Sequence, residues 1–300
     1  MNRTLLRGLG FELGARAESG ESDDGAWFAT APDGAPVVLK WFPDAAVAER
    51  YAVLLPALDE LRSRGVPVPE YPFVHVVDGW TISAQRVLEG RSWGAVNGHG
   101  ARFAPPELVD RVIESVGAAA GIVGPRPAPS LSRSAVMIHT LTVGEVGWAL
   151  HAPLRSWSAR SAALLERIEA VGADSDASWF STTGLVHFDL HTGNLLASDD
   201  GALTGIIDWD SACAGDHHFD LVAFAFDLDG AGKQIWDRVE PLVEPHLLRA
   251  YVAHMALRCT DWAIRHHPDD VPRQVDRAER VLDRCATSVH LPTGGTSPAG

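Results

Sequence analysis

The segment of residues 185–210, LVHFDLHTGNLLASDDGALTGIIDWD, restricts the fold most, because it places carboxylate and amide side chains among apolar, strand-like residues. Burying a carboxylate without a partner costs several kcal/mol or forces it to take up a proton. A turn signal at residues 198–201 separates two apolar runs and predicts a hairpin whose ends bring oxygen atoms together. Asp189, Asn194 and Asp208 would then offer the hard oxygen ligands that Mg²⁺ prefers.

The spacing within this segment also matches a catalytic loop for phosphoryl transfer. Asn194 follows Asp189 by five residues, and Asp208 comes after the predicted turn. In that chemistry an aspartate accepts the proton of the attacking hydroxyl, an asparagine holds a metal ion, and a second aspartate links the metal to the nucleotide phosphates. The pattern therefore predicts Asp189 as the catalytic residue, and Asn194 and Asp208 as ligands of Mg²⁺.

Several details of the loop distinguish it from the loop of protein kinases. Residues 208–210 read Asp-Trp-Asp where protein kinases have Asp-Phe-Gly, and His191 and Gly193 lie inside the loop. Residues 215–221, GDHHFDL, and residues 65–69, GVPVP, are similar to two further motifs of one family of small-molecule kinases. In these motifs the chain resembles the aminoglycoside phosphotransferase family, the branch of the kinase-like fold that also contains choline kinases.

This resemblance implies an α+β, bilobal protein-kinase-like fold. Residues 1–88 would form an N-terminal nucleotide-binding lobe with a small antiparallel sheet and one main helix. Residues 89–300 would form a larger helical lobe that carries the catalytic loop and the substrate site. ATP or GTP, the implied phosphate donor, would lie between the two lobes.

Lys40 lies in an apolar run, VVLKWF, that predicts a strand. A compact ammonium inside a strand suits the α- and β-phosphates of a nucleotide. The resemblance implies a glutamate partner on the following amphipathic helix, residues 44–64, and we expect Glu49 to be that partner, with Glu60 as the alternative. Pro56 inside this span is expected to kink or divide the helix.

The resemblance implies three further nucleotide contacts in the N-terminal lobe. Residues 18–25 form a turn-rich segment that would fold over the phosphates, and Ser22 occupies the place of a serine near the tip of this loop in the antibiotic kinases. Gln85 and Val87, at the end of a predicted strand, would contact the base through their backbone groups. Their side chains do not distinguish ATP from GTP.

Charge is distributed unevenly along the chain, whose formal net charge is −14. Between Arg167 and Lys233 there is no Lys or Arg, while twelve Asp and Glu residues fall in this segment. A cleft built from it would repel nucleic acid and concentrate cations. We therefore expect a metal ion and a cationic substrate, and no nucleic-acid partner.

The C-terminal part, from residue 221 to residue 289, predicts three helices with a break at residues 241–245. By resemblance, this is where small-molecule kinases build the acceptor pocket. Asp227, Asp261 and Trp262 are candidates for holding a cation there. We expect the acceptor to be a small cationic hydroxyl compound, such as an aminoglycoside or a basic peptide antibiotic of the tuberactinomycin type. Its O-phosphorylation would give drug resistance.

The sequence leaves three other functions open. One is a metabolic kinase that acts on choline, a sugar or an amino alcohol. Another is a nucleotide-binding pseudokinase, although the presence of the lysine, both aspartates and the asparagine argues against it. The third is a metal-dependent hydrolase, because His187, Asp189 and His191 alternate and would share one face of a strand.

The cellular environment is predicted from cysteine usage and hydropathy. Three cysteines, Cys213, Cys259 and Cys285, are too few and too scattered for a disulfide framework or a zinc site. The chain has no long uncharged apolar run, and no charged start followed by an apolar core. These observations predict a cytoplasmic protein without a membrane partner, and we expect a monomer or a dimer.

Overall fold

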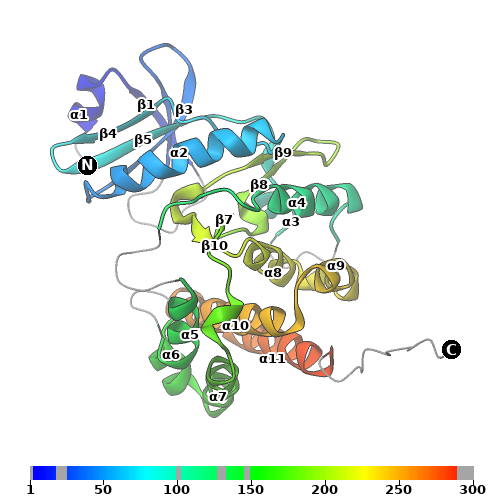
Figure 1. The fold of residues 1–300 in the computed structure, drawn as a ribbon. Helices are drawn as coiled ribbons and strands as arrows, with labels where there is room; N and C mark the ends of the chain where they lie inside the picture. The colour runs from blue at the N-terminus through cyan, green and yellow to red at the C-terminus, as the bar shows by residue number, and fades with distance from the viewer. Residues whose placement is uncertain (1–2, 18–25, 99–102, 127–132, 145–148, 289–300) are drawn as a thin grey trace. The chain divides into compact units, whose positions relative to one another are not determined.

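The computed structural model describes residues 3–17, 26–98, 103–126, 133–144 and 149–288. The chain divides into two compact units, Met1–Pro129 with Thr183–Ala231, and Ser130–Thr182 with Gly232–Gly300. An antiparallel sheet forms in the N-terminal region and helices dominate the C-terminal part, which confirms the predicted α+β class (Figure 1). The lobe boundary between residues 88 and 89 stays a prediction.

The first unit begins with a helix and a five-stranded antiparallel sheet in the order β1-β2-β3-β5-β4. Their bounds are α1 Arg3–Gly8, β1 Glu12–Arg16, β2 Trp27–Thr30, β3 Pro36–Phe42, β4 Phe73–Val77 and β5 Trp80–Arg86. Burial alternates along β3, so that Val37, Leu39 and Trp41 enter an apolar core. Lys40 therefore points to the opposite face, where Ser83 of β5 is its partner in the strand register.

Helix α2, Val47–Ser63, lies along this sheet beside β4 and β5 (Figure 1). Five of its residues are buried, among them Tyr51, Leu54 and Leu58. The helix continues through Pro56, so this proline does not divide it, and the alternative expectation of a kink stays a prediction. Burial of the apolar face offsets the cost of a proline inside a helix, which is about 3 kcal/mol because the ring removes a backbone hydrogen bond and crowds the preceding turn.

The rest of the first unit surrounds the segment that the sequence singled out. The predicted hairpin around residues 198–201 is confirmed, since β8 pairs with β9, and β7 pairs with β10 across the loop. The bounds are β6 Arg91–Ser92, β7 Gly184–Val186, β8 Leu195–Ala197, β9 Leu203–Ile206 and β10 Cys213–Gly215. The helices of this part are α3 Trp93–Asn97, α4 Pro106–Ala118 and α8 His218–Asp227.

The second unit is helical in its described residues. Its helices are α5 Arg133–Thr142, α6 His151–Trp157, α7 Ala159–Ala173, α9 Lys233–Val239, α10 Pro245–His266 and α11 Val271–Ser288. The predicted break at residues 241–245 is confirmed, because α9 ends before it and Pro245 begins α10. Within the described part of the chain, no helix has the length and apolar character needed to cross a membrane.

Candidate active site

The loop that carries Asp189 runs from β7 to a 3₁₀ turn at Thr192–Asn194. The Asp220 carboxylate, on α8, accepts hydrogen bonds from the backbone N–H groups of His187 at 2.6 Å and Phe188 at 2.9 Å. Phe188 has a φ of 70°, which is strained for a residue with a large side chain. Its ring stacks on Phe219, 5.1 Å away between ring centroids. Helix α8 therefore fixes the backbone immediately before Asp189.

The other end of α8 holds the far side of the same loop. The Asp227 carboxylate is buried and accepts hydrogen bonds from the Thr192 N–H, at 2.8 Å, and from the Thr192 hydroxyl. Asp220 and Asp227 are seven residues apart, so they lie two turns apart on one face of the helix. Asp227, predicted to contact substrate, is thus committed to a contact within the loop.

A further constraint on the loop comes from α3. Ser92 caps this helix, because its Oγ accepts a hydrogen bond from the Ala95 N–H, and the same hydroxyl donates to the Gly193 carbonyl oxygen at 2.9 Å. A Cβ added to Gly94 would lie 2.6 Å from the Gly193 nitrogen and 2.8 Å from the Thr192 carbonyl carbon. The backbone of α3 therefore packs directly against the loop, and this contact requires glycine.

The imidazoles of His187 and His191 form hydrogen bonds with backbone groups in and beside the loop. Buried His187 donates from Nε2 to the Ile207 carbonyl oxygen at 2.8 Å and accepts from the Asp189 N–H at 3.3 Å. Burial lowers the pKa of His187, which keeps the ring neutral in this arrangement. His191 accepts from the Gly193 N–H at 3.0 Å. These contacts give no support to a hydrolase that would use both histidines as metal ligands.

Asn194 and Asp208 supply oxygen atoms of the kind that Mg²⁺ prefers. The Asn194 amide nitrogen donates to the Asp189 carbonyl oxygen at 2.9 Å, which leaves the amide oxygen for a ligand role. Asp208 adopts the left-handed conformation, with φ 68° and ψ 56°, and its carboxylate already contacts a cation, the Lys40 ammonium. The donor set therefore fits a divalent metal ion.

Lys40 is held by two carboxylates. Its Nζ lies 2.7 Å from Asp208 Oδ1 and 2.6 Å from Asp210 Oδ2. Burial alone would lower the pKa of Lys40 and raise that of Asp208, but the opposite charges reverse both directions. The lysine is therefore an ammonium and Asp208 a carboxylate in this structure.

The predicted glutamate partner of Lys40 is not in place. Glu49 is exposed, and Glu60 forms an ion pair with Arg64. A helix turns by about 100° per residue, so Glu49 lies about 200° around the helix from buried Tyr51, which faces the lysine's side of the sheet. The hydroxyl of Tyr51 instead donates a hydrogen bond to Asp210 Oδ1.

The predicted nucleotide contacts of the N-terminal lobe are placed as follows. Ser22 lies outside the described residues. Gln85 is buried in β5 opposite Val38, and Val87 follows directly after this strand, where its N–H donates to the Pro36 carbonyl oxygen at 3.4 Å. Their contacts with a base stay predictions.

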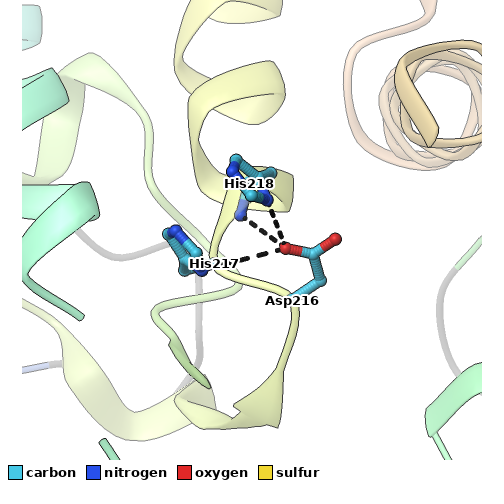
Figure 2. Close-up of side chains that lie close together, drawn as sticks. All are labelled: Asp216, His217 and His218. Atoms are coloured by element: carbon cyan, nitrogen blue, oxygen red, sulfur yellow. Dashed lines mark hydrogen bonds and ion pairs between the residues drawn. The ribbon is translucent and has the colours of Figure 1, made fainter. Parts of the chain in front are cut away.

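Figure 2 shows a second group with metal-ligand chemistry at the start of α8: Asp216, His217 and His218. The Asp216 Oδ1 accepts from the His218 N–H at 3.1 Å and lies 2.7 Å from its Nδ1, whereas the His217 Nδ1 is 3.8 Å away. One possible ligand atom from each residue lies within 4.8 Å of the others. The backbone contact is that of a carboxylate at a helix start, so we interpret Asp216 as fixing the first turn of α8, which carries Asp220.

Comparison with known proteins identifies the family of the chain. Residues 14–263 match the model of the phosphotransferase enzyme family, APH. The chain belongs to this family. The match confirms the resemblance that the loop motifs indicate, and it covers both the sheet that carries Lys40 and the loop that carries Asp189.

Solved structures of phosphotransferases share the fold of this family member. A GDP and kanamycin complex of APH(2")-IIia has a TM-score of 0.55 and 16% identity, covering 92% of this chain and 94% of that chain. An ethanolamine kinase of Plasmodium vivax has a TM-score of 0.51 and 11% identity, with 96% and 85% covered. ADP-bound APH(2'')-Ib has a TM-score of 0.50 and 14% identity, with 94% and 97% covered.

A curated sequence relative is the uncharacterized protein YcbJ of Bacillus subtilis (strain 168), which is 30% identical over 79 residues. The match covers 22% of this chain, and it spans only 26% of the relative's length. At these levels of identity the solved structures show the fold of this phosphotransferase family member and leave its acceptor open.

The two substrate candidates of α10 differ in their surroundings. Asp261 is fully buried, and its carboxylate accepts from Arg265 Nε at 2.9 Å and Nη2 at 2.7 Å. Trp262 is exposed and its ring lies 3.9 Å from the His266 ring, between centroids. Trp262 is therefore accessible to a ligand, whereas Asp261 is engaged by an arginine one turn away.

Sequence reasoning missed several residues that shape the site of this phosphotransferase. Arg50, Tyr51 and Gly94 were not singled out, and Asp210 and Asp220 were recognised within motifs but given no role. Arg50 Nη2 donates to the Asp210 carbonyl oxygen at 3.1 Å. Asp210 lies in a 3₁₀ turn that follows Asp208, whose backbone is left-handed, so the strand alternation of the sequence does not explain why both carboxylates contact Lys40.

Proposed function

We propose that this phosphotransferase transfers the γ-phosphoryl group of ATP or GTP to a hydroxyl of a small cationic molecule. The carrying observation is the contact of Lys40 with Asp208 beside the loop that holds Asp189 and Asn194. Lys40 and Asp208 are 168 positions apart in the sequence, and their contact brings a cation for the phosphates next to an oxygen ligand for a metal ion. The loop beside them adds the Asp189 carboxylate for the acceptor. This is the equipment that phosphoryl transfer requires.

The residues have the following roles in this proposal. Asp189 orients the acceptor hydroxyl and takes its proton, and Lys40 binds nucleotide phosphates. Asn194 and Asp208 would hold Mg²⁺, which supplies positive charge to the phosphates when it is bound. Because such catalysis depends mainly on positioning and charge, the firm anchoring of the loop by α8 supports the assignment.

A nucleotide donor is supported by the structural relatives. APH(2'')-Ib is described as ADP-bound and APH(2")-IIia as a GDP complex. Both purine nucleotides therefore remain candidates. Ser22, Gln85 and Val87 would contact this nucleotide. A cytoplasmic location is consistent with the proposal, because ATP and GTP are available there.

For the acceptor we propose a cationic antibiotic, an aminoglycoside or a tuberactinomycin-type peptide, whose phosphorylation would give resistance. The unbroken acidic segment between Arg167 and Lys233 supports a cationic acceptor, and one structural relative is a kanamycin complex. A metabolic kinase is the second candidate, because another relative is described as an ethanolamine kinase.

The test measures nucleotide turnover with Mg²⁺ and a panel of acceptors comprising aminoglycosides, tuberactinomycin peptides, choline, ethanolamine and amino sugars. Mass spectrometry would show which acceptor gains a phosphate. Asp189→Ala is the inactive variant, and Asp199→Ala is its matched control, because Asp199 lies on the surface in the turn after β8 and pairs with Arg91.

Transfer to an antibiotic by the wild type and Asp199→Ala, but not by Asp189→Ala, would support the proposal. Growth protection of a sensitive host would then follow. Transfer only to choline, ethanolamine or a sugar would favour the metabolic kinase. Normal turnover in Asp189→Ala would refute the catalytic assignment, and nucleotide binding without transfer to any acceptor would favour the pseudokinase.

A further inference from the structure

Asp210 connects the strand that carries Lys40 to helix α2. Its Oδ2 accepts from the Lys40 ammonium at 2.6 Å, and its Oδ1 accepts from the Tyr51 hydroxyl. The Tyr51 oxygen is also 3.2 Å from Ser83 Oγ. Since a phenol has one proton, which it donates to the carboxylate, the serine hydroxyl donates to the phenol. A chain of hydrogen bonds thus runs from Ser83 through Tyr51 and Asp210 to Lys40.

This chain of contacts is buried at its outer end. Tyr51 is 2% exposed and Ser83 is also 2% exposed, so water does not compete for the phenol. The ring of Tyr51 lies against Phe42 and Tyr71, at centroid distances of 6.4 Å and 5.5 Å. The packing fixes the ring, and the ring fixes the direction in which its hydroxyl points.

The two aspartates that contact Lys40 explain why no glutamate of α2 is needed as its partner. Asp208 and Asp210 already place two carboxylates on one ammonium. A third carboxylate from the helix would add negative charge to an occupied site, whereas a phenol adds a donor without charge. Helix α2 therefore acts on the lysine through Asp210. Arg50 of this helix also donates a hydrogen bond to the carbonyl oxygen of Asp210.

We propose that Tyr51 is a positioning residue for the phosphate-binding lysine: it orients Asp210, and Asp210 retains Lys40 when Asp208 is engaged by a metal ion. The role in nucleotide binding rests on the proposed function, whereas the restraint of Lys40 by Tyr51 does not. Two measurements separate these parts.

The first measurement needs no nucleotide. Lys40 and Lys233 are the only lysines in the chain, and Lys233 lies on the surface, so it is an internal reference. Acetylation by sulfo-N-hydroxysuccinimide acetate, followed by peptide mass spectrometry, gives the rate at Lys40 relative to Lys233. Tyr51→Phe removes only the hydroxyl and should raise this ratio about fivefold, because Asp210 is freed to turn away from the ammonium.

Two variants serve as matched controls. Tyr71→Phe removes a hydroxyl from the same aromatic cluster, and this hydroxyl is buried without a hydrogen-bond partner among the described residues. Glu49→Gln neutralises the exposed carboxylate on the same helix. Both should label Lys40 at the wild-type rate.

The second measurement compares the affinity of the protein for adenosine and for ATP with Mg²⁺, or for guanosine and GTP if turnover prefers them. Tyr51→Phe should lower the gain in affinity from nucleoside to triphosphate about tenfold and leave nucleoside affinity unchanged. A variant that merely destabilised the fold would weaken both ligands.

Faster labelling of Lys40 in Tyr51→Phe alone, with the selective loss of triphosphate affinity, would support the inference. Wild-type labelling in a folded Tyr51→Phe protein would overturn it, as would the same effects appearing in Glu49→Gln. Absence of nucleotide binding in the wild type would refute the proposed function, while the labelling result would still decide whether Tyr51 restrains Lys40.

Discussion

The carboxylate of Asp227 accepts hydrogen bonds from both the backbone N–H and the hydroxyl of Thr192. This contact joins the last residue of α8 to the loop between Asp189 and Asn194. Two turns earlier on the same helix, Asp220 holds the backbone before Asp189. Asp220 and Asp227 of α8 therefore hold the two sides of the loop in place.

Replacing Asp227 with alanine should destabilise the protein and reduce turnover. The substitution leaves the Thr192 N–H and hydroxyl without their acceptor in a buried place, which costs about 1–3 kcal/mol of the free energy of unfolding. Urea denaturation measures the loss, and Asp227→Asn should lose less because its amide keeps one oxygen acceptor. Equal stability of Asp227→Ala and the wild type would contradict this role.

Gly94→Ala should disturb the loop from the side of α3. The added Cβ would meet backbone atoms of Thr192 and Gly193, which cannot move as a flexible side chain could. We expect a loss of about 1–3 kcal/mol in stability and a fall in kcat. Gly117→Ala is the control, because a Cβ at this helical position meets nothing within 4 Å, and alanine favours the helix by up to about 1 kcal/mol.

His187 should make stability depend on pH below neutrality. Burial lowers its pKa from the ordinary value of 6.5, so the unfolded chain binds a proton before the folded chain does. The contribution is complete above pH 6.5 and is lost as the pH falls towards the folded pKa. Urea denaturation from about pH 7.5 to about pH 5.5 covers this range. The free energy of unfolding should depend less on pH in His187→Asn than in the wild type. An unchanged slope would show that the ring titrates normally.

Asp33 should titrate at an unusually low pH. A hydrogen bond from Arg86, with Nη2 2.6 Å from Oδ2, lowers its pKa from 3.8 to about 2, and the Ala35 N–H adds to the effect. The stabilising contact is present above pH 3.8 and is lost as the pH falls through about 2. Carbon-13 NMR of the Asp33 carboxyl group measures this, and Arg86→Gln should return the pKa towards 3.8. A normal value in the wild type would mean that the surface pair does not persist in solution.

The sequence by itself determined the β8–β9 hairpin, most of the long helices and the spacing of Asp189, Asn194 and Asp208, on which the proposed catalytic role rests. These features depend on spacing over a few residues: alternation for strands, a 3.6-residue period for helices, and turn residues between them. The family followed from the same local patterns, because the loop motif is contiguous. The prolines at residues 241 and 245 placed the break before α10, where Pro245 begins the helix.

Only the tertiary structure decided which side chains meet. The rotation of α2 about its axis decides which of its side chains lies towards Lys40: Tyr51, which hydrogen-bonds the lysine's partner Asp210, and not Glu49. Asp227 resembled a candidate ligand in the sequence, but its burial is satisfied by Thr192. Asp261 pairs with Arg265 four residues later on the same helix, a contact that helical spacing could have indicated. The physical reason is that a buried carboxylate takes the nearest donor in space, and spatial neighbours 35 or 160 residues apart leave no local pattern in the chain.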